Sequence, residues 1–163
     1  MRVMGIDGGV SGAIAVLDGN YGVLEVHDVP TFTIRVGGKE RRELDGHDFI
    51  DICRRYLDGG FGLDKILFER GQGARDQSAP AAYSYGFTNG RMVGIAEALQ
   101  IPYELVDPAA WKRALKLLGK TKDDSRKLAK QLFPKVADLF ARKGDHGRAE
   151  AALIAYFALY RGV

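Results

Sequence analysis

The amino-acid sequence predicts one α/β domain, residues 1–163, with a mixed five-stranded sheet flanked by helices. The chain is 46% hydrophobic and 28% charged, which suits a single globular domain with a full core. Two short apolar runs, residues 3–7 and 65–69, are typical of strands that are buried on both faces. Strand-like segments dominate the beginning of the chain and helical segments the rest, with no repeat or linker between them.

The first half of the chain predicts three antiparallel strands, a helix and a further strand. The second and third strands are joined by Asp18-Gly-Asn-Tyr-Gly22, which is hairpin chemistry. Residues 31–42 contain a Gly-Gly pair and five charged side chains, and we expect a mobile loop there. Asp45 is a candidate N-cap for the helix. The expected strands are 3–7, 12–18, 23–29 and 65–69, and the expected helix is 46–58.

The second half of the chain predicts helices around one more strand. Asp107-Pro108 supplies an N-cap and a proline at the first helical position, and the helix that follows should end near Gly119. Asp145 precedes the last helix. The other expected elements are an irregular segment at 71–80, helices at 81–99 and 122–133, a last helix from just after Asp145 to about residue 160, and a strand at 103–106.

This order of elements is the ribonuclease H-like arrangement. Three antiparallel strands come first, and parallel strands with crossover helices follow. In such a sheet the strand at 3–7 and the strand at 65–69 can lie side by side. Asp7 and Glu69, which end these strands, would then meet at one end of the sheet, and the last helix could bring a third carboxylate.

Carboxylates in apolar settings are the main functional signal. Asp7, Glu69, Asp145 and Glu150 all border apolar runs, where an isolated ionised carboxylate is costly. A hard divalent cation with oxygen ligands would offset that cost. Two such ions about 4 Å apart can support phosphodiester hydrolysis, which needs several carboxylates from separate elements. The alternative is that these are surface acids at element ends, with Asp145 as an N-cap.

The last pair of acids leaves two choices of ligand. Residues 145 and 150 are about 140° apart around a helix, so they converge only if Asp145 lies outside it. His146 and Glu150 do share a helix face. The last ligand could therefore be Asp145, which we favour, or His146, which could equally be a solvated residue of the first turn.

Positive charge is concentrated in one segment. The whole chain carries a net charge of only +3, but residues 110–135 hold nine Lys or Arg against two Asp and are therefore +7. This segment suits contact with a phosphate backbone, although a solvated helix face is the alternative. Within it, we expect Trp111 to anchor the core. The candidate DNA contacts are Lys112, Arg113, Lys116, Lys120, Lys122 and Arg126.

Three glycines, Gly86, Gly90 and Gly94, recur every four residues on one face of the helix at 81–99. Each costs roughly 1 kcal/mol relative to alanine in a helix interior, so a close contact should compensate. That contact could be the protein's own sheet or a second subunit.

Cysteine usage and hydropathy limit the setting. Cys53 is the only cysteine, so neither an intramolecular disulfide nor a zinc cluster can form. Met1-Arg2 runs directly into a strand, so we expect no signal peptide, and no apolar run approaches the ~20 residues of a membrane span. We expect a protein that is not secreted and not in a membrane, in the cytoplasm or nucleoid or in an organellar or viral setting.

Several motifs resemble the RuvC Holliday junction resolvases, above all their chloroplast branch. They are Gly5-Ile-Asp-Gly-Gly-Val-Ser-Gly-Ala-Ile-Ala-Val, Leu67-Phe-Glu-Arg-Gly-Gln and Asp145-His-Gly-Arg-Ala-Glu-Ala-Ala-Leu-Ile-Ala. Trp111-Lys112, Lys122-Asp-Asp-Ser-Arg126 and Phe133-Pro134 are similar to further motifs of the chloroplast branch.

The resemblance implies a homodimeric endonuclease that cuts four-way DNA junctions by paired symmetric nicks. It implies two Mg²⁺ ions per active site, for which Mn²⁺ can substitute. Asp7, Glu69, Asp145 and Glu150 match its acidic positions, and Lys112 and Lys122 match basic positions near the scissile phosphate. The sequence departs from bacterial RuvC at Gly8, where proline is usual, and in the spacing of the last two acids. It also has no clear match to the bacterial junction-wedging aromatic within residues 70–77.

Two other functions use the same residues. A ribonuclease H-type enzyme would cut RNA–DNA hybrids with the same chemistry. A non-catalytic junction-binding protein would keep the fold, but the acids present at every motif argue against it.

Overall fold

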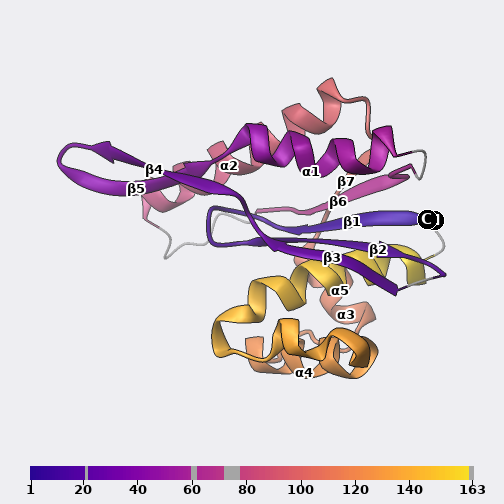
Figure 1. The fold of residues 1–163 in the computed structure, drawn as a ribbon. Coiled ribbons are helices and arrows are strands. Elements are labelled where there is room, and N and C mark those ends of the chain that lie inside the picture. The colour runs from indigo at the N-terminus through magenta and orange to yellow at the C-terminus, as the bar shows by residue number, and fades with distance from the viewer. Residues whose placement is uncertain (21, 60–61, 72–77, 162–163) are drawn as a thin grey trace.

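The computed structural model describes residues 1–20, 22–59, 62–71 and 78–161. It contains a mixed five-stranded sheet with the strand order β3-β2-β1-β6-β7 (Figure 1). The central strand, β1, pairs antiparallel with β2 and parallel with β6, so the predicted adjacency of the first and fourth sheet strands is confirmed. The strands of this sheet are β1 Arg2–Asp7, β2 Ala13–Asp18, β3 Gly22–Asp28, β6 Lys65–Glu69 and β7 Tyr103–Val106.

Helices cover both faces of the sheet (Figure 1). Helices α1 and α2 lie on one face, and α5 lies on the other, with α4 packed against the outer side of α5. Among the described residues, no helix is both long and apolar enough to cross a membrane. The helices are α1 Gly46–Asp58, α2 Ala79–Ala98, α3 Pro108–Ala114, α4 Lys122–Leu132 and α5 His146–Tyr160, with 3-10 turns at η1 Pro134–Phe140 and η2 Lys143–Asp145.

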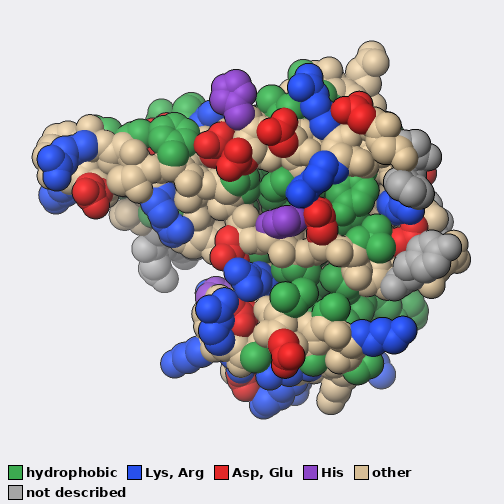
Figure 2. Space-filling view, viewed as in Figure 1, with side chains coloured by type: hydrophobic (Ala, Val, Ile, Leu, Met, Phe, Trp, Pro, Cys, Tyr) green, Lys and Arg blue, Asp and Glu red, His purple; other side chains and the backbone are tan. Residues whose placement is uncertain are grey.

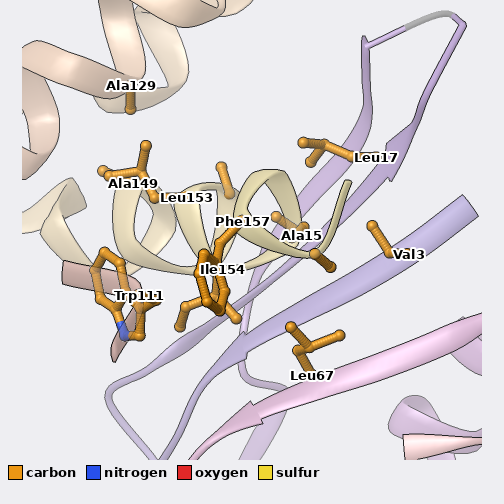
Figure 3. Close-up of a cluster of buried hydrophobic side chains, with 14 of the residues drawn as sticks. Val3, Ala15, Leu17, Leu67, Trp111, Ala129, Ala149, Leu153, Ile154 and Phe157 are labelled. Atoms are coloured by element: carbon orange, nitrogen blue, oxygen red, sulfur yellow. The ribbon is translucent and has the colours of Figure 1, made fainter. Parts of the chain in front are cut away.

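The alternation of side chains along each strand divides the core into two clusters. Val3 and Leu67 belong to the cluster that packs against α5 (Figure 3), whereas Met4 belongs to the cluster under α1 and α2. Because successive strand residues point to opposite faces, Asp7 lies on the same face as Val3, and Glu69 on the same face as Leu67. Both carboxylates are therefore directed to the α5 side of the sheet.

Helix α5 lies very close to β1 because small residues line the contact. The helix is buried almost all round, and five of its buried residues are alanines. On the strand, a Cβ added to Gly5 would clash with the carbonyl oxygen of Ala151 and lie 2.5 Å from the backbone nitrogen of Ala155. The absence of a side chain at Gly5 therefore sets how near the first turns of α5 can come to the end of β1.

The predicted loop at residues 31–42 is wrong, because these residues form most of a β-hairpin. Strands β4 (Thr31–Val36) and β5 (Lys39–Leu44) pair antiparallel and make a separate two-stranded sheet, called here the arm, which projects beyond the main sheet (Figure 1). Gly37 and Gly38 have φ values of 57° and 76°, as a tight two-residue hairpin turn requires. The Gly-Gly pair was a hairpin signal, and the many charges reflect strands that are mostly exposed.

Most other boundaries agree with the expectations. Asp45 caps α1 by accepting hydrogen bonds from the backbone nitrogens of His47 and Asp48, and Asp107 caps α3. Helix α3 ends at Ala114, five residues before the expected end at Gly119. Most of the segment expected to be irregular, residues 72–77, lies outside the described residues, as does most of the stretch compared with the wedging aromatic.

Candidate active site

Three carboxylates from three separate elements come together at one end of the sheet. Asp7 ends β1 and Glu69 ends β6, and they follow the paired residues Ile6 and Phe68 of this parallel ladder. Glu150 lies in the second turn of α5 and is almost fully buried. The charges of Glu150 and Glu69 both act on Asp7, so the predicted convergence of these three acids is what the structure shows.

Asp7 is at the electrostatic centre of this group. Burial, followed by the charges of Glu150 and Glu69, raises the pKa of Asp7 well above its ordinary value. Lys112 and Lys122 oppose the shift without cancelling it. No described residue donates a hydrogen bond to the Asp7 carboxylate. Asp7 is thus a partly exposed carboxylate without a protein donor among the described residues.

Glu69 is fixed by a tryptophan. The indole nitrogen Nε1 of Trp111 donates a hydrogen bond of 2.7 Å to Oε2 of Glu69. Burial raises the pKa of Glu69, and the hydrogen bond from Trp111 and the charge of Lys112 act against that rise. Trp111 is fully buried in the cluster under α5, so its predicted role as a core anchor is confirmed.

Glu150 is held by groups on two helices that pack near α5. The Lys112 ammonium of α3 lies 3.6 Å from Oε1 of Glu150, and the Ser125 hydroxyl of α4 donates to the same oxygen at 3.3 Å. Lys112 also lies over the ring of Trp111, 5.0 Å from its centroid. The predicted catalytic lysine Lys112 is therefore in the site, in contact with a carboxylate.

Helix α2 clamps the ends of the two acid-bearing strands from the other face. Asn89 accepts a hydrogen bond of 3.1 Å from the backbone nitrogen of Gly9, and the Tyr85 hydroxyl donates to the backbone oxygen of Glu69 at 3.4 Å. A Cβ at Gly8 would lie 2.5 Å from the Asn89 amide. The glycines after Asp7 thus permit close packing of this turn against α2.

The first turn of α5 passes over Asp7. A Cβ added to Gly147 would lie 3.0 Å from Oδ2 of Asp7. Gly147 is one helical turn before Glu150. This turn of α5 therefore brings both the Gly147 backbone and the Glu150 carboxylate to the end of β1, where Asp7 lies. A larger residue at 147 would push against the Asp7 carboxylate.

Asp145 has partners of its own, and they differ from those of the three central acids. Its carboxylate accepts a hydrogen bond of 2.7 Å from the backbone nitrogen of Arg142 and pairs with the Arg142 guanidinium. The Arg148 guanidinium lies 4.0 Å from Oδ1 of Asp145, and it donates two hydrogen bonds, of 2.7 and 2.8 Å, to the Asp28 carboxylate. Burial acts to raise the pKa of Asp145, but the hydrogen bonds from Arg142 outweigh it and hold that pKa below its ordinary value.

The structure does not support the alternative in which the Asp145 side chain caps α5. Asp145 occupies the position before the helix, but its side chain makes no capping hydrogen bond because it turns back to Arg142. It is also absent from the charges that act most strongly on Asp7. The structure therefore places Asp145 in an arginine network that joins η2 and α5 to β3.

His146 faces Lys122 at the edge of the site. The Lys122 ammonium lies 3.3 Å from Nε2 of His146, and Nδ1 of that ring lies 3.4 Å from the carbonyl oxygen of Lys143. These residues border a surface cavity of about 680 Å³ that Arg126 and Gly144 also line. The charge of Lys122 acts on Asp7, so this basic cavity adjoins the carboxylates.

The other residues expected to contact DNA divide into two groups. Arg113, Lys116 and Lys120 are exposed. The Arg126 side chain is only 13% exposed, because it pairs with Asp123 at 2.7 Å and donates to the carbonyl oxygen of Ala141 at 3.3 Å. Arg126 thus joins α4 to the end of η1, and little of it is accessible to a ligand.

The donor set fits a hard divalent cation. Three carboxylates that repel one another, one of them without a hydrogen-bond donor among the described residues, are the oxygen ligands that Mg²⁺ or Mn²⁺ prefers. In the described part of the chain, however, no three His, Cys, Asp or Glu side chains already form a group that could hold a metal ion. The carboxylates converge, and a cation would have to draw them closer.

The sequence did not reveal four of the residues that shape this site. Trp111, Ser125, Tyr85 and Asn89 all support the acids or the turn after Asp7. Ser125 and Trp111 lie within motifs that resemble those of the chloroplast resolvases. The sequence therefore marked both residues but did not show which acids they contact. Tyr85 and Asn89 are four residues apart on α2, a spacing that indicates a shared face but not which face.

Comparisons with known proteins bear on the fold and on part of the sequence. No protein-family model matches the chain. Over 80 residues, 48% of the chain, the sequence is 38% identical to the chloroplast Holliday junction resolvase MOC1 of Chlamydomonas reinhardtii, and the matched stretch spans only 9% of that protein.

The structural match extends over the whole fold. Thermus thermophilus RuvC in complex with a Holliday junction substrate superposes with a TM-score of 0.67 at 15% identity, covering 99% of this chain and 96% of RuvC. A second structure of Thermus thermophilus RuvC gives a TM-score of 0.62 at 16% identity, with 99% and 97% covered. The chain therefore has the ribonuclease H-like fold of RuvC, and along slightly less than half of its length its sequence resembles that of a chloroplast Holliday junction resolvase.

Proposed function

We propose that this protein is a metal-dependent endonuclease that resolves four-way DNA junctions by paired, symmetric nicks. The observation that carries the proposal is the convergence of Asp7, Glu69 and Glu150 from β1, β6 and α5, with Lys112 and Lys122 beside them. The names of the similar proteins, a junction resolvase and a RuvC bound to a junction, support the substrate.

Asp7, Glu69 and Glu150 would hold two Mg²⁺ ions, for which Mn²⁺ can substitute. When bound, such ions supply a nucleophile at neutral pH and stabilise charge on the leaving oxygen. The protein's own part is to orient the three carboxylates and to keep Lys112 and Lys122 near the scissile phosphate. Asp145, which the sequence favoured as the last ligand, would have to leave Arg142 to join them, and His146 would have to leave Lys122.

Basic side chains lie on both sides of this site. Arg35, Lys39, Arg41 and Arg42 are exposed on the arm, and Arg113, Lys116 and Lys120 are exposed on and after α3. Figure 2 shows basic side chains on the arm and on the lower lobe that contains α4, with the surface hollowed between them. We propose that DNA lies across this hollow, with its phosphates in contact with both groups.

The substrate can be tested with three labelled nucleic acids. A four-way junction, an RNA–DNA hybrid and a plain duplex should be incubated with the protein with and without Mg²⁺. The proposal predicts symmetric nicks in the junction only when Mg²⁺ is present. Preferred cutting of the hybrid would indicate a ribonuclease H-type enzyme, and tight junction binding without any nick would indicate a non-catalytic binding protein.

Lys122→Ala should weaken junction binding and slow cleavage. Lys122 is exposed beside the basic cavity, and the loss of one phosphate contact should reduce the slope of log affinity against log salt by roughly one unit. Arg54→Ala removes one exposed positive charge from α1, on the opposite face of the sheet, and should change neither quantity. Fluorescence anisotropy at several salt concentrations measures both, and identical slopes for the two variants would place Lys122 away from DNA.

We also propose that the protein is a homodimer, because one domain holds one site and two strands must be cut. The candidate interface is the outer face of α2. A Cβ at Gly86, Gly90 or Gly94 would meet no described residue within 4 Å, so these glycines do not pack against the described strands of the protein's own sheet. Tyr83 and Phe87 on the same face are 71% and 42% exposed, and their rings stack 5.7 Å apart. A helix this apolar on its exposed side fits a partner surface.

Gly90→Leu should give monomers, because a leucine would prevent close approach of two α2 helices. Gly90→Ala is the matched control: it fits the open space, favours the helix by roughly 1 kcal/mol and should remain dimeric. Light scattering measures the state of both. A folded Gly90→Leu dimer would reject this interface, whereas a wild-type monomer, both free and on junction DNA, would reject the dimer itself.

A further inference from the structure

Trp111 is placed so that it touches a functional carboxylate from within the core. Its side chain is fully buried at the edge of the cluster under α5 (Figure 3), where it could pack as any large apolar residue does. Its indole Nε1, however, donates to Oε2 of Glu69 at 2.7 Å. A buried indole N–H needs an acceptor, and here the acceptor is an acid of the proposed site rather than a nearby carbonyl.

The hydrogen bond from Trp111 occupies Oε2 of Glu69 and does not involve Oε1. No described residue donates to Oε1. A charge-assisted bond of this length restricts the rotation of a carboxylate more than a neutral bond would. Since Trp111 is itself held by the core, Glu69 has a fixed orientation in which Oε1 is the oxygen available to a cation.

Helix α3, which carries Trp111, also contacts a second acid of the proposed site. Lys112, the next residue of α3, lies 3.6 Å from Oε1 of Glu150. Adjacent residues of a short helix therefore reach one carboxylate on β6 and another on α5. Asp107 fixes the start of this helix by capping it at the end of β7, so the positions of both side chains follow from the sheet.

We propose that Trp111 is a positioning residue for metal binding, which orients Glu69 through Oε2 so that Oε1 can bind a divalent cation. This role rests on the proposed function, because it requires Glu69 to be a metal ligand. It differs from a packing role in one respect: the indole N–H, and not only the volume of the ring, determines the affinity for the cation.

The first test is Mg²⁺ binding by isothermal titration calorimetry. Trp111→Phe keeps an aromatic ring and removes the N–H, and groups that orient a ligand in this way usually change metal affinity by 10–100-fold. We expect Mg²⁺ affinity to fall by about tenfold or more. Phe140→Leu, in the same cluster and fully buried, is the control for lost packing and should bind Mg²⁺ like the wild type. Equal affinities in Trp111→Phe and the wild type would overturn the proposal.

A second test needs no variant of Trp111. This is the only tryptophan in the chain, so its fluorescence reports on one indole. Mg²⁺ binding at Glu69 should shift the emission of the wild type, and Glu69→Gln should abolish the response. Saturating Mg²⁺ with calorimetric binding but no spectral change would overturn the role of Trp111 and leave the metal site intact. Wild-type protein that binds no Mg²⁺ would overturn both this role and the metal-dependent function.

Discussion

Asp7→Asn should abolish cleavage of a four-way junction while leaving the affinity for the junction almost unchanged. Asp7 is the acid on which the charges of Glu69 and Glu150 both act, and an amide at this position would lose the charge that a divalent cation requires. Removal of one group that stabilises transition-state charge typically costs about 10²–10³-fold in rate. We expect the cleavage rate to fall by at least that factor. The affinity for the junction should persist, because phosphate contacts elsewhere supply the binding energy. A gel assay with Mg²⁺ measures the rate, and a binding titration without Mg²⁺ measures the affinity.

The same variant should be more stable than the wild type when Mg²⁺ is absent. A carboxyl whose pKa is raised by folding binds its proton more tightly in the folded state, so the folded protein gains stability as pH falls through the raised pKa toward the ordinary pKa of an aspartate. Ionisation of Asp7 therefore destabilises the fold, and asparagine at this position removes that charge. Thermal melting without Mg²⁺ should show a higher midpoint for Asp7→Asn, and Mg²⁺ should raise the wild-type midpoint more than that of the variant. Near-normal nicking by the purified variant would reject the assignment of Asp7.

The sequence predicted the part of the site that depends on the sheet. Asp7 and Glu69 were identified because each ends an apolar run, and the order of elements made those runs parallel neighbours. Both conclusions need only the two-residue period of strands and the topology. Glu150 followed in the same way from the position of the last helix. These residues depend on regular geometry, and regular geometry can be read from a single sequence.

The side-chain partners were not predictable in this way. Asp145 has the chemistry and the position in the sequence that a metal ligand requires. Arg142, three residues earlier, nevertheless donates hydrogen bonds to the Asp145 carboxylate from both its backbone nitrogen and its guanidinium. The direction of a side chain in a turn depends on such a local competitor. Trp111 was expected in the core. The acceptor of its N–H could not be predicted, because it depends on how α3 packs against the end of β6. The arm was not predicted because its strands are charged and mostly exposed, as a loop would be, although the Gly37-Gly38 pair is typical of a hairpin turn.

Gly5→Ala should damage both the fold and the site, although Gly5 touches no acid. The added methyl group would clash with backbone atoms of Ala151 and Ala155 on α5, and backbone atoms cannot swing away as a flexible side chain can. Helix α5 must then move away from β1, and Glu150, one residue before Ala151, must move away from Asp7. Overpacking of this kind typically lowers the free energy of unfolding by about 1–3 kcal/mol. Urea denaturation measures that change, and the cleavage rate at a temperature where the variant is folded measures the displacement of Glu150.

Gly19→Ala is the matched control for this substitution. A Cβ at Gly19 would lie 3.6 Å from its nearest neighbours, Leu159 and Met1, which is ordinary van der Waals contact. Its stability and cleavage rate should therefore stay close to those of the wild type. If Gly5→Ala were as stable and as active as Gly19→Ala, α5 could not rest on β1 as closely as described. The position of Glu150 would then depend on another contact, such as the approach of Gly147 to the Asp7 carboxylate at the end of β1.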